Sequence, residues 1–91
     1  MTSAGRNHSS AKVRVLVSGD CASCDRAVEV VAAVRRVRPD MTVDLIDVDV
    51  DGVPDDIAFV GTPMYVWGDR VISLGNPAPQ DLLTILEGAR P

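Results

Sequence analysis

Hydrophobic and polar positions along the first half of the chain predict a strand, a helix and a second strand. Residues 12–18 are rich in valine and are typical of a buried strand. Residues 24–38 carry apolar side chains at helical spacing, and Pro39 then ends the helix. Residues 41–48 have the apolar content of another strand. Because a strand, a helix of about four turns and a strand form a right-handed βαβ unit, we expect these two strands to be parallel.

The second half of the chain predicts a short helix, a hairpin and a final helix. Residues 53–59 have room for one or two helical turns that begin at Pro54. Residues 64–67 and 70–74 are brief apolar strands, and the two residues between them suit a tight antiparallel hairpin with Gly68 at the positive-φ position. Residues 80–87 have an apolar stripe at helical spacing, followed by a glycine that stops the helix.

Composition and charge limit the classes of protein that fit this pattern. The 91 residues, 46% of them hydrophobic, support a single core, so we expect a disordered tail at residues 1–11 and one domain at residues 12–91. The formal net charge of -4 argues against a nucleic-acid groove. The chain has neither an export signal nor the roughly 18 apolar residues of a membrane helix, so we expect a cytoplasmic protein with no membrane partner.

The two cysteines, Cys21 and Cys24, lie three residues apart between the first predicted strand and the first predicted helix. In the cytoplasm, cysteines so spaced are more often catalytic or metal-binding than structural, and this context is typical of a redox motif. The free N–H groups at the helix start should stabilise a Cys21 thiolate, which the Asp20 carboxylate opposes to a smaller extent. His8, the only histidine, falls in the predicted tail and is not expected to act in catalysis.

The order of elements and two motifs resemble the thioredoxin-like superfamily in its small, glutaredoxin-sized form. The motifs are the Cys-Ala-Ser-Cys pair and the segment Gly61-Thr62-Pro63-Met64-Tyr65-Val66, and the resemblance covers roughly residues 12–88. It implies an α/β fold of the order βαβ(α)ββα with a four-stranded mixed sheet. It also implies a cis Thr62–Pro63 bond, with Thr62 pairing to the substrate backbone and Pro63 shaping the groove.

The activity that this resemblance implies is thiol–disulfide exchange. Cys21 attacks a substrate disulfide, and the more buried Cys24 then attacks Cys21 to release the reduced substrate. The reaction requires no cofactor and no metal. Its partners would be a disulfide-containing protein or a low-molecular-weight thiol, together with a reductase or thiol donor.

Several positions depart from the family pattern. Asp20 replaces the tryptophan that precedes the first cysteine of thioredoxins, and Ala22-Ser23 replaces their Gly-Pro pair. Because the residues between the cysteines tune the reduction potential, the resemblance does not predict its value. Thioredoxins also have a buried aspartate that handles the proton of the second cysteine. The matching position in this chain is near Val15, so that aspartate is missing here. Glutaredoxins bind glutathione partly through a Gly-Gly segment with an acidic residue, where this chain has residues 74–77, Leu-Gly-Asn-Pro, so glutathione use is not expected.

Two alternatives to exchange remain open at this stage. Residues 19–24, Gly-Asp-Cys-Ala-Ser-Cys, also resemble the loop of heavy-metal-associated domains, whose two thiolates hold Cu(I) or another soft metal. Those domains end on a strand and have methionine where this chain has Asp20. A structural zinc would need more ligands than the two cysteines and His8. The other alternative is a non-catalytic scaffold that binds partners.

One face of the predicted sheet has little chain to cover it. Only residues 49–61 separate the second predicted strand from Thr62, and they are expected to supply a single short helix. An exposed apolar surface there would favour a homodimer, a docking partner or the N-terminal tail folding over it. Tyr65 and Trp67 are the side chains most able to contribute to such a surface, although core packing is the ordinary role of both.

Overall fold

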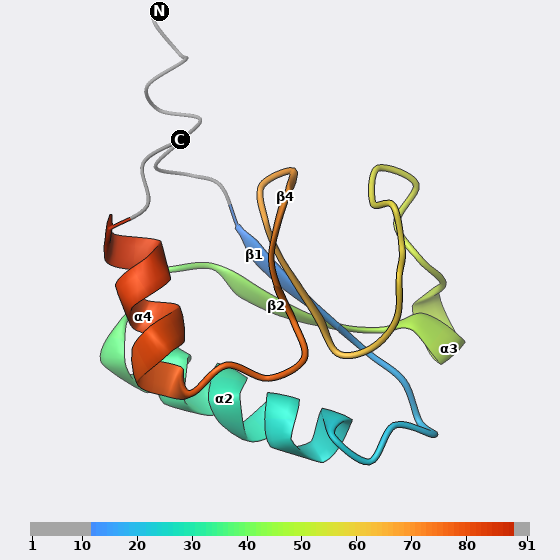
Figure 1. Ribbon diagram of the computed structural model, residues 1–91, viewed down its shortest axis with the longest axis horizontal. Helices are drawn as coiled ribbons and strands as arrows, with labels where there is room; N and C mark the ends of the chain where they lie inside the picture. The colour runs from blue at the N-terminus through green and yellow to red at the C-terminus, as the bar shows by residue number, and fades with distance from the viewer. Residues whose placement is uncertain (1–11, 89–91) are drawn as a thin grey trace, which may run out of the picture.

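The computed structural model describes residues 12–88, which form an α/β domain with one four-stranded mixed sheet and three helices (Figure 1). The predicted tail at residues 1–11, His8 included, lies outside the described residues. Within residues 12–88 no helix has the length and apolar character needed to cross a membrane. The elements in chain order are β1 (Val13–Val17), α2 (Cys24–Val37), β2 (Val43–Asp47), α3 (Val48–Asp51), β3 (Met64–Trp67), β4 (Arg70–Leu74) and α4 (Pro79–Gly88).

The strands lie in the order β2-β1-β3-β4, with β1 at the centre of the sheet. β1 pairs parallel to β2, which confirms the βαβ unit, and its last residue, Val17, lies opposite Asp47. β3 pairs antiparallel to β1 and, through a tight turn, antiparallel to β4. Gly68 in that turn has φ of 65°, the conformation that the hairpin prediction required.

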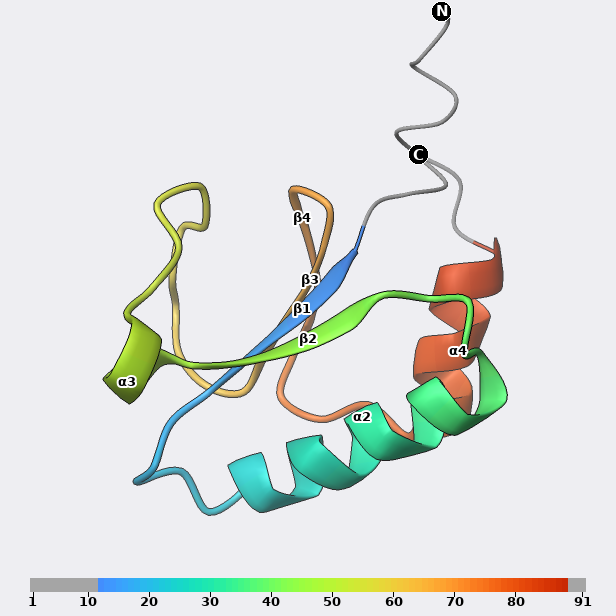
Figure 2. The same cartoon turned by 180° about the vertical axis from the view of Figure 1, so that it is seen from behind.

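The main core lies between the sheet and the two longer helices, α2 and α4, which cover the same face (Figures 1 and 2). The apolar spacing of α2 produces this packing because one side of the helix faces the sheet, and the helix ends where the Arg38 N–H bonds the Val34 carbonyl oxygen. The residues of this core that are buried are Val13, Val15, Val17, Cys24, Ala27, Val30, Val31, Val34, Val43, Tyr65, Leu82 and Leu86.

The short helix is not where the sequence predicts it. We expected it to begin at Pro54, whereas α3 occupies Val48–Asp51, directly after β2. The Asp47 carboxylate accepts a hydrogen bond from the Asp49 N–H at 2.9 Å and so caps the helix start. Gly52, with φ of 77°, ends it. Residues 54–57 form a turn instead, closed by a bond from the Ile57 N–H to the Pro54 carbonyl oxygen.

The opposite face of the sheet is covered by the irregular segment 52–62 rather than by a long helix. Its core is a small cluster of Leu16, Ile57, Met64 and Val66, in which Ile57 is the contribution of that segment. Tyr65 and Trp67 take the ordinary role expected of them and pack in the helix-covered core, because alternate residues of β3 point to opposite faces. Segment 52–62, which covers the other face, carries exposed apolar side chains, with Phe59 and Val60 among them. The homodimer, docking partner or tail contact that an apolar surface here would favour stays a prediction.

Candidate active site

Cys21 and Cys24 are joined by a disulfide at the point where the chain passes from β1 into α2. Their Cα atoms lie 5.2 Å apart. Cys24 is the first residue of α2 and is only 5% exposed, whereas Cys21 lies in the preceding turn and is partly exposed. Of the two residues, Cys21 is therefore the more accessible to an external thiol.

The turn that holds the pair is built from backbone hydrogen bonds. The Cys24 N–H donates to the Cys21 carbonyl oxygen at 3.0 Å, and the Ala27 N–H donates to the Ser23 carbonyl oxygen at 3.2 Å. Ser23 is the N-cap residue, yet its hydroxyl lies 3.9 Å from the Cys21 sulfur instead of capping the helix. The N–H groups at the start of a helix carry partial positive charge, which favours negative charge on the nearby sulfurs.

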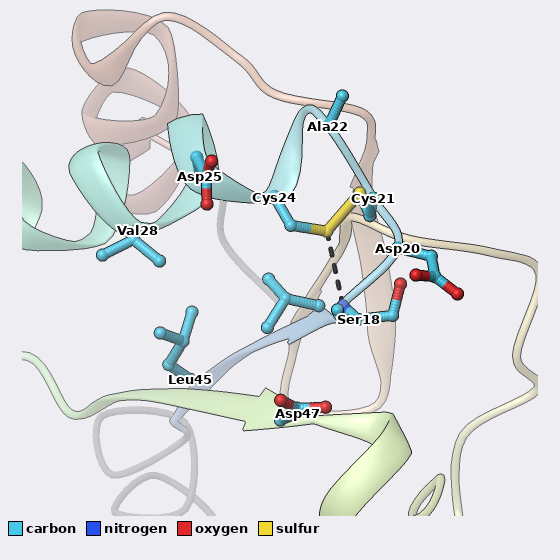
Figure 3. A pocket seen from close by; sticks show the side chains of 11 residues that line it. Ser18, Asp20, Cys21, Ala22, Cys24, Asp25, Val28, Leu45 and Asp47 are labelled. Atoms are coloured by element: carbon cyan, nitrogen blue, oxygen red, sulfur yellow. Dashed lines mark hydrogen bonds between the residues drawn. A yellow bond between two sulfur atoms is a disulfide. The ribbon is translucent and has the colours of Figure 1, made fainter.

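Ser18, the residue after β1, contacts both Cys24 and the segment that contains Pro63. Its N–H donates to the Cys24 sulfur at 3.4 Å (Figure 3). Its hydroxyl lies 3.0 Å from the Thr62 hydroxyl. The Thr62–Pro63 bond is cis, Pro63 is buried, and the Pro63 carbonyl oxygen accepts a bond from the Gly75 N–H at 2.9 Å. The structure thus brings Thr62, distant in sequence, to the strand end that supports Cys24.

Asn76 is a site residue to which the sequence analysis gave no role of its own, because it appeared there only within residues 74–77. Its side-chain amide donates to the Ser23 carbonyl oxygen at 2.8 Å, and its carbonyl oxygen Oδ1 accepts a bond from the Tyr65 hydroxyl at 2.8 Å. Tyr65 is fully buried, and burial raises the pKa of its phenol to about 12. No local pattern around Asn76 indicates this role, because both of its partners come from distant elements.

A cavity of about 620 Å³ opens beside the disulfide, between α2 and the ends of β1 and β2 (Figure 3). Val17, Val28 and Leu45 form its apolar walls, with Val28 reaching in from α2 and Leu45 from β2. The carboxylates around it are those of Asp20, Asp25 and Asp47. Both cysteines line this cavity, whereas Thr62 and Pro63 do not.

Metal coordination has little support beyond the two sulfurs. Within residues 12–88 no group of three or more histidine, cysteine, aspartate or glutamate side chains is arranged to hold a metal ion. The two cysteines are oxidised to a disulfide in this structure, a state in which their sulfurs are bonded to each other. The chemistry that the arrangement offers directly is exchange at a sulfur–sulfur bond.

Comparisons with known proteins leave the site to be interpreted from its own geometry. No protein-family model matches the chain, and the searches of curated proteins and of solved structures gave no match.

Proposed function

We propose that this protein is a thiol–disulfide oxidoreductase with a small thioredoxin-like fold. The observation that carries the proposal is the disulfide between a partly exposed Cys21 and a buried Cys24 at the start of α2. Exchange needs one sulfur that a partner can reach and a second that can displace the partner afterwards. The different exposure of the two cysteines meets both needs.

The fold supports the same proposal. A βαβ unit followed by an antiparallel hairpin and a final helix, with strand order β2-β1-β3-β4, agrees with the order that the resemblance implies. The dithiol follows the central strand, and segment 61–66 reaches the end of that strand through Thr62. The second face, covered only by α3 and segment 52–62, is the main departure.

In the oxidised protein, a partner thiolate attacks the Cys21 sulfur, and the bond to Cys24 breaks. Cys24 leaves as a thiolate, which the Ser18 N–H and the free N–H groups of the first turn of α2 stabilise. A second partner thiol then attacks the partner sulfur of the mixed disulfide and releases Cys21. In the reverse direction Cys24 is the resolving thiol, so the same contacts serve reduction and oxidation.

Proton transfer to and from Cys24 must take a route through solvent in this protein. Thioredoxins place an aspartate on the strand before the motif, but the matching residue here, Val15, is a fully buried side chain of β1. Cys24 itself lines the cavity of about 620 Å³, which is wide enough to hold water. We therefore propose that water in this cavity, rather than a buried carboxylate, exchanges the proton.

Thr62 and Pro63 are proposed to hold the backbone of the partner. The contact between the Thr62 and Ser18 hydroxyls supports this, because it holds segment 61–63 beside the end of β1. Ser18 at that end also donates its N–H to the Cys24 sulfur. Asn76 occupies the segment where glutaredoxins hold glutathione, and its amide is already bonded to Ser23 and Tyr65. A disulfide-containing protein, with a separate reductase or thiol donor, therefore fits better than glutathione.

The direct test is reduction of insulin disulfides by the pre-reduced protein. We expect Cys21→Ser to abolish the activity and Cys24→Ser to trap the substrate as a mixed disulfide, while Ala32→Ser, at an exposed position of α2 that does not line the cavity, serves as the matched control. If neither cysteine variant lost activity, the proposal would be refuted. A protein that binds one Cu(I) through both thiols during gel filtration and does not reduce insulin would support metal transfer instead.

A further inference from the structure

The cavity beside the disulfide has an unbalanced negative charge. Asp20, Asp25 and Asp47 line it, and no lysine or arginine of residues 12–88 does. A fourth carboxylate, that of Asp49, accepts a hydrogen bond from the Gly19 N–H at 2.8 Å, in the turn that leads to Cys21. The surroundings of the reactive sulfur therefore attract cations and repel anions.

Of the basic side chains of residues 12–88, four form ion pairs outside the cavity, Arg35 bonds the Val43 carbonyl oxygen, and the other two, Arg36 and Arg70, do not line the cavity. Lys12 bonds Asp44, Arg14 bonds Asp56, Arg26 lies 3.8 Å from Glu29, and Arg38 bonds both Asp40 and Glu87. Within residues 12–88 none of the three cavity carboxylates has an ion-pair partner. The start of α2 contributes only about half of a positive charge, which is less than the carboxylates carry.

The walls of the cavity are apolar and open to solvent. Val28 belongs to the apolar stripe of α2 in the sequence but is 47% exposed, and Leu45 on the edge strand β2 is 36% exposed. Both line the cavity next to Cys24. An aliphatic side chain of a bound partner would remove this apolar surface from water, which is favourable.

We propose that the partner of the Cys21–Cys24 disulfide is a cationic protein segment, in which lysine or arginine flanks the reacting cysteine and an aliphatic side chain lies nearby. The inference rests on the proposed exchange function. Three carboxylates beside one accessible sulfur select for positive charge, while Val28 and Leu45 accept the aliphatic group. Glutathione, which carries a net negative charge at neutral pH, is disfavoured by the same field.

With such a segment, the reduced protein reacts in two exchange steps. The Cys21 thiolate attacks one sulfur of the partner disulfide, forms a mixed disulfide, and displaces the other partner sulfur as a thiolate that takes a proton from water. Cys24 gives its proton to water and attacks the Cys21 sulfur, and the second partner sulfur leaves as a thiolate. Two electrons pass from the protein dithiol to the partner disulfide.

The charge preference is tested with three disulfide-linked peptides that differ only in having Lys, Gln or Glu on both sides of the cysteine. Each rate with the reduced protein is divided by the rate of the same peptide with 2-mercaptoethanol, because flanking charge also changes the peptide's own reactivity. We expect the Lys peptide to react about tenfold faster or more than the Glu peptide at low salt. The ratio should fall towards unity between about 0.01 and about 1 M salt, where the screening length shrinks from about 30 to about 3 Å.

Matched variants assign the preference to the cavity. The cavity triple variant D20N/D25N/D47N should reduce the Lys-to-Glu ratio to about a third or less, since electrostatic steering depends on local charge. Asparagine at position 47 still caps α3. The control D55N/D69N/D81N changes the net charge equally at exposed positions that do not line the cavity, and it should keep the ratio. If the cavity triple variant does not fold, Asp20→Asn alone should reduce the ratio in part.

The apolar wall has its own comparison. With Lys peptides that carry either leucine or serine two residues from the cysteine, we expect the leucine peptide to react faster. Val28→Ser should remove that advantage, whereas Val37→Ser, which changes an exposed valine on the same helix away from the cavity, should keep it.

The outcomes separate the two proposals. Equal normalised rates for the Lys and Glu peptides, a control triple variant that loses the ratio as much as the cavity triple variant, or equal rates for the leucine and serine peptides would overturn the inference and leave exchange intact. Failure of all three charge peptides to react faster with the protein than with its Cys21→Ser variant would overturn the proposed function itself.

Discussion

The Asn76 side-chain amide donates a hydrogen bond to the Ser23 carbonyl oxygen at 2.8 Å and thereby ties the chain after β4 to one of the two residues between the cysteines. The same Asn76 side chain accepts the bond of the buried Tyr65 hydroxyl. A single residue thus satisfies a buried polar group in the sheet and fixes the start of α2, which links the stability of the core to the position of the disulfide.

Asn76→Ala should destabilise the protein by about 2 kcal/mol, because it leaves the buried Tyr65 hydroxyl without an acceptor and also removes the bond to Ser23. Urea unfolding of the oxidised proteins measures the change. Tyr65→Phe removes the hydroxyl instead and should cost less, about 1 kcal/mol. In the double variant the two effects should not add, since both remove the same bond. Additive effects would show that the bond between Tyr65 and Asn76 contributes nothing.

Tyr65 should make the protein lose stability in alkaline solution. The unfolded chain releases the phenolic proton near pH 10, whereas the folded protein, with a pKa of about 12, holds it longer. The unfolded state therefore binds fewer protons between these values, and the free energy of unfolding falls as pH rises from about 10 to about 12. Unfolding midpoints across this range measure the slope, with Tyr65→Phe as the control. An equal slope in that variant would contradict the assignment. Because Tyr65 is the only tyrosine, its ultraviolet titration reads the pKa directly.

After reduction, Cys21 should be alkylated much faster than Cys24. Cys24 is 5% exposed and lies under the Ser18 N–H, whereas Cys21 is partly exposed in the turn. We expect a difference of about tenfold or more in the rate constants for iodoacetamide, since both thiolate character and access favour Cys21. Mass spectrometry of a time course, with each single serine variant as reference, measures both rates. Equal rates would mean that the two sulfurs do not have separate roles.

Ile57→Ala should destabilise the protein by about 2 to 4 kcal/mol, the usual cost of removing a buried isoleucine side chain. Ile57 is 9% exposed and is the contribution of segment 52–62 to the small core on the second face of the sheet. Val60→Ala, at a position that is 71% exposed, should change stability little and serves as the control. Thermal unfolding measures both variants. A small effect of Ile57→Ala would show that segment 52–62 does not depend on this contact.

The main elements could be predicted because their apolar periods are long and uninterrupted. The valines of β1 and the stripe of α2 leave few alternatives, and Gly68 with its neighbour sets the hairpin. The position of α3 could not be predicted with the same rules. Pro54 and Asp47 both offer plausible helix starts, and the capping bond to the Asp49 N–H decides between them only in three dimensions.

The candidate site could be predicted only where its residues are neighbours in the sequence. Cys21 and Cys24 form a local motif, and their spacing alone brought them together. The cavity depends on the register between β1 and β2, which sets Val17 opposite Asp47 and so brings an aspartate from another strand beside the disulfide. Asn76 was missed for a similar reason, because its hydrogen bonds span elements that the pattern cannot relate.

The central position of β1 has a consequence for how other molecules sense the oxidation state. Ser18 directly follows a strand that is paired on both sides, so the donor to Cys24 is positioned by the middle of the sheet. We therefore expect the turn of residues 19–23 to take up most of the adjustment when the sulfur bond opens or closes. A partner that contacts any other part of the molecule would then meet the same surface in the oxidised and reduced forms. Only a partner that contacts this turn would distinguish the two forms.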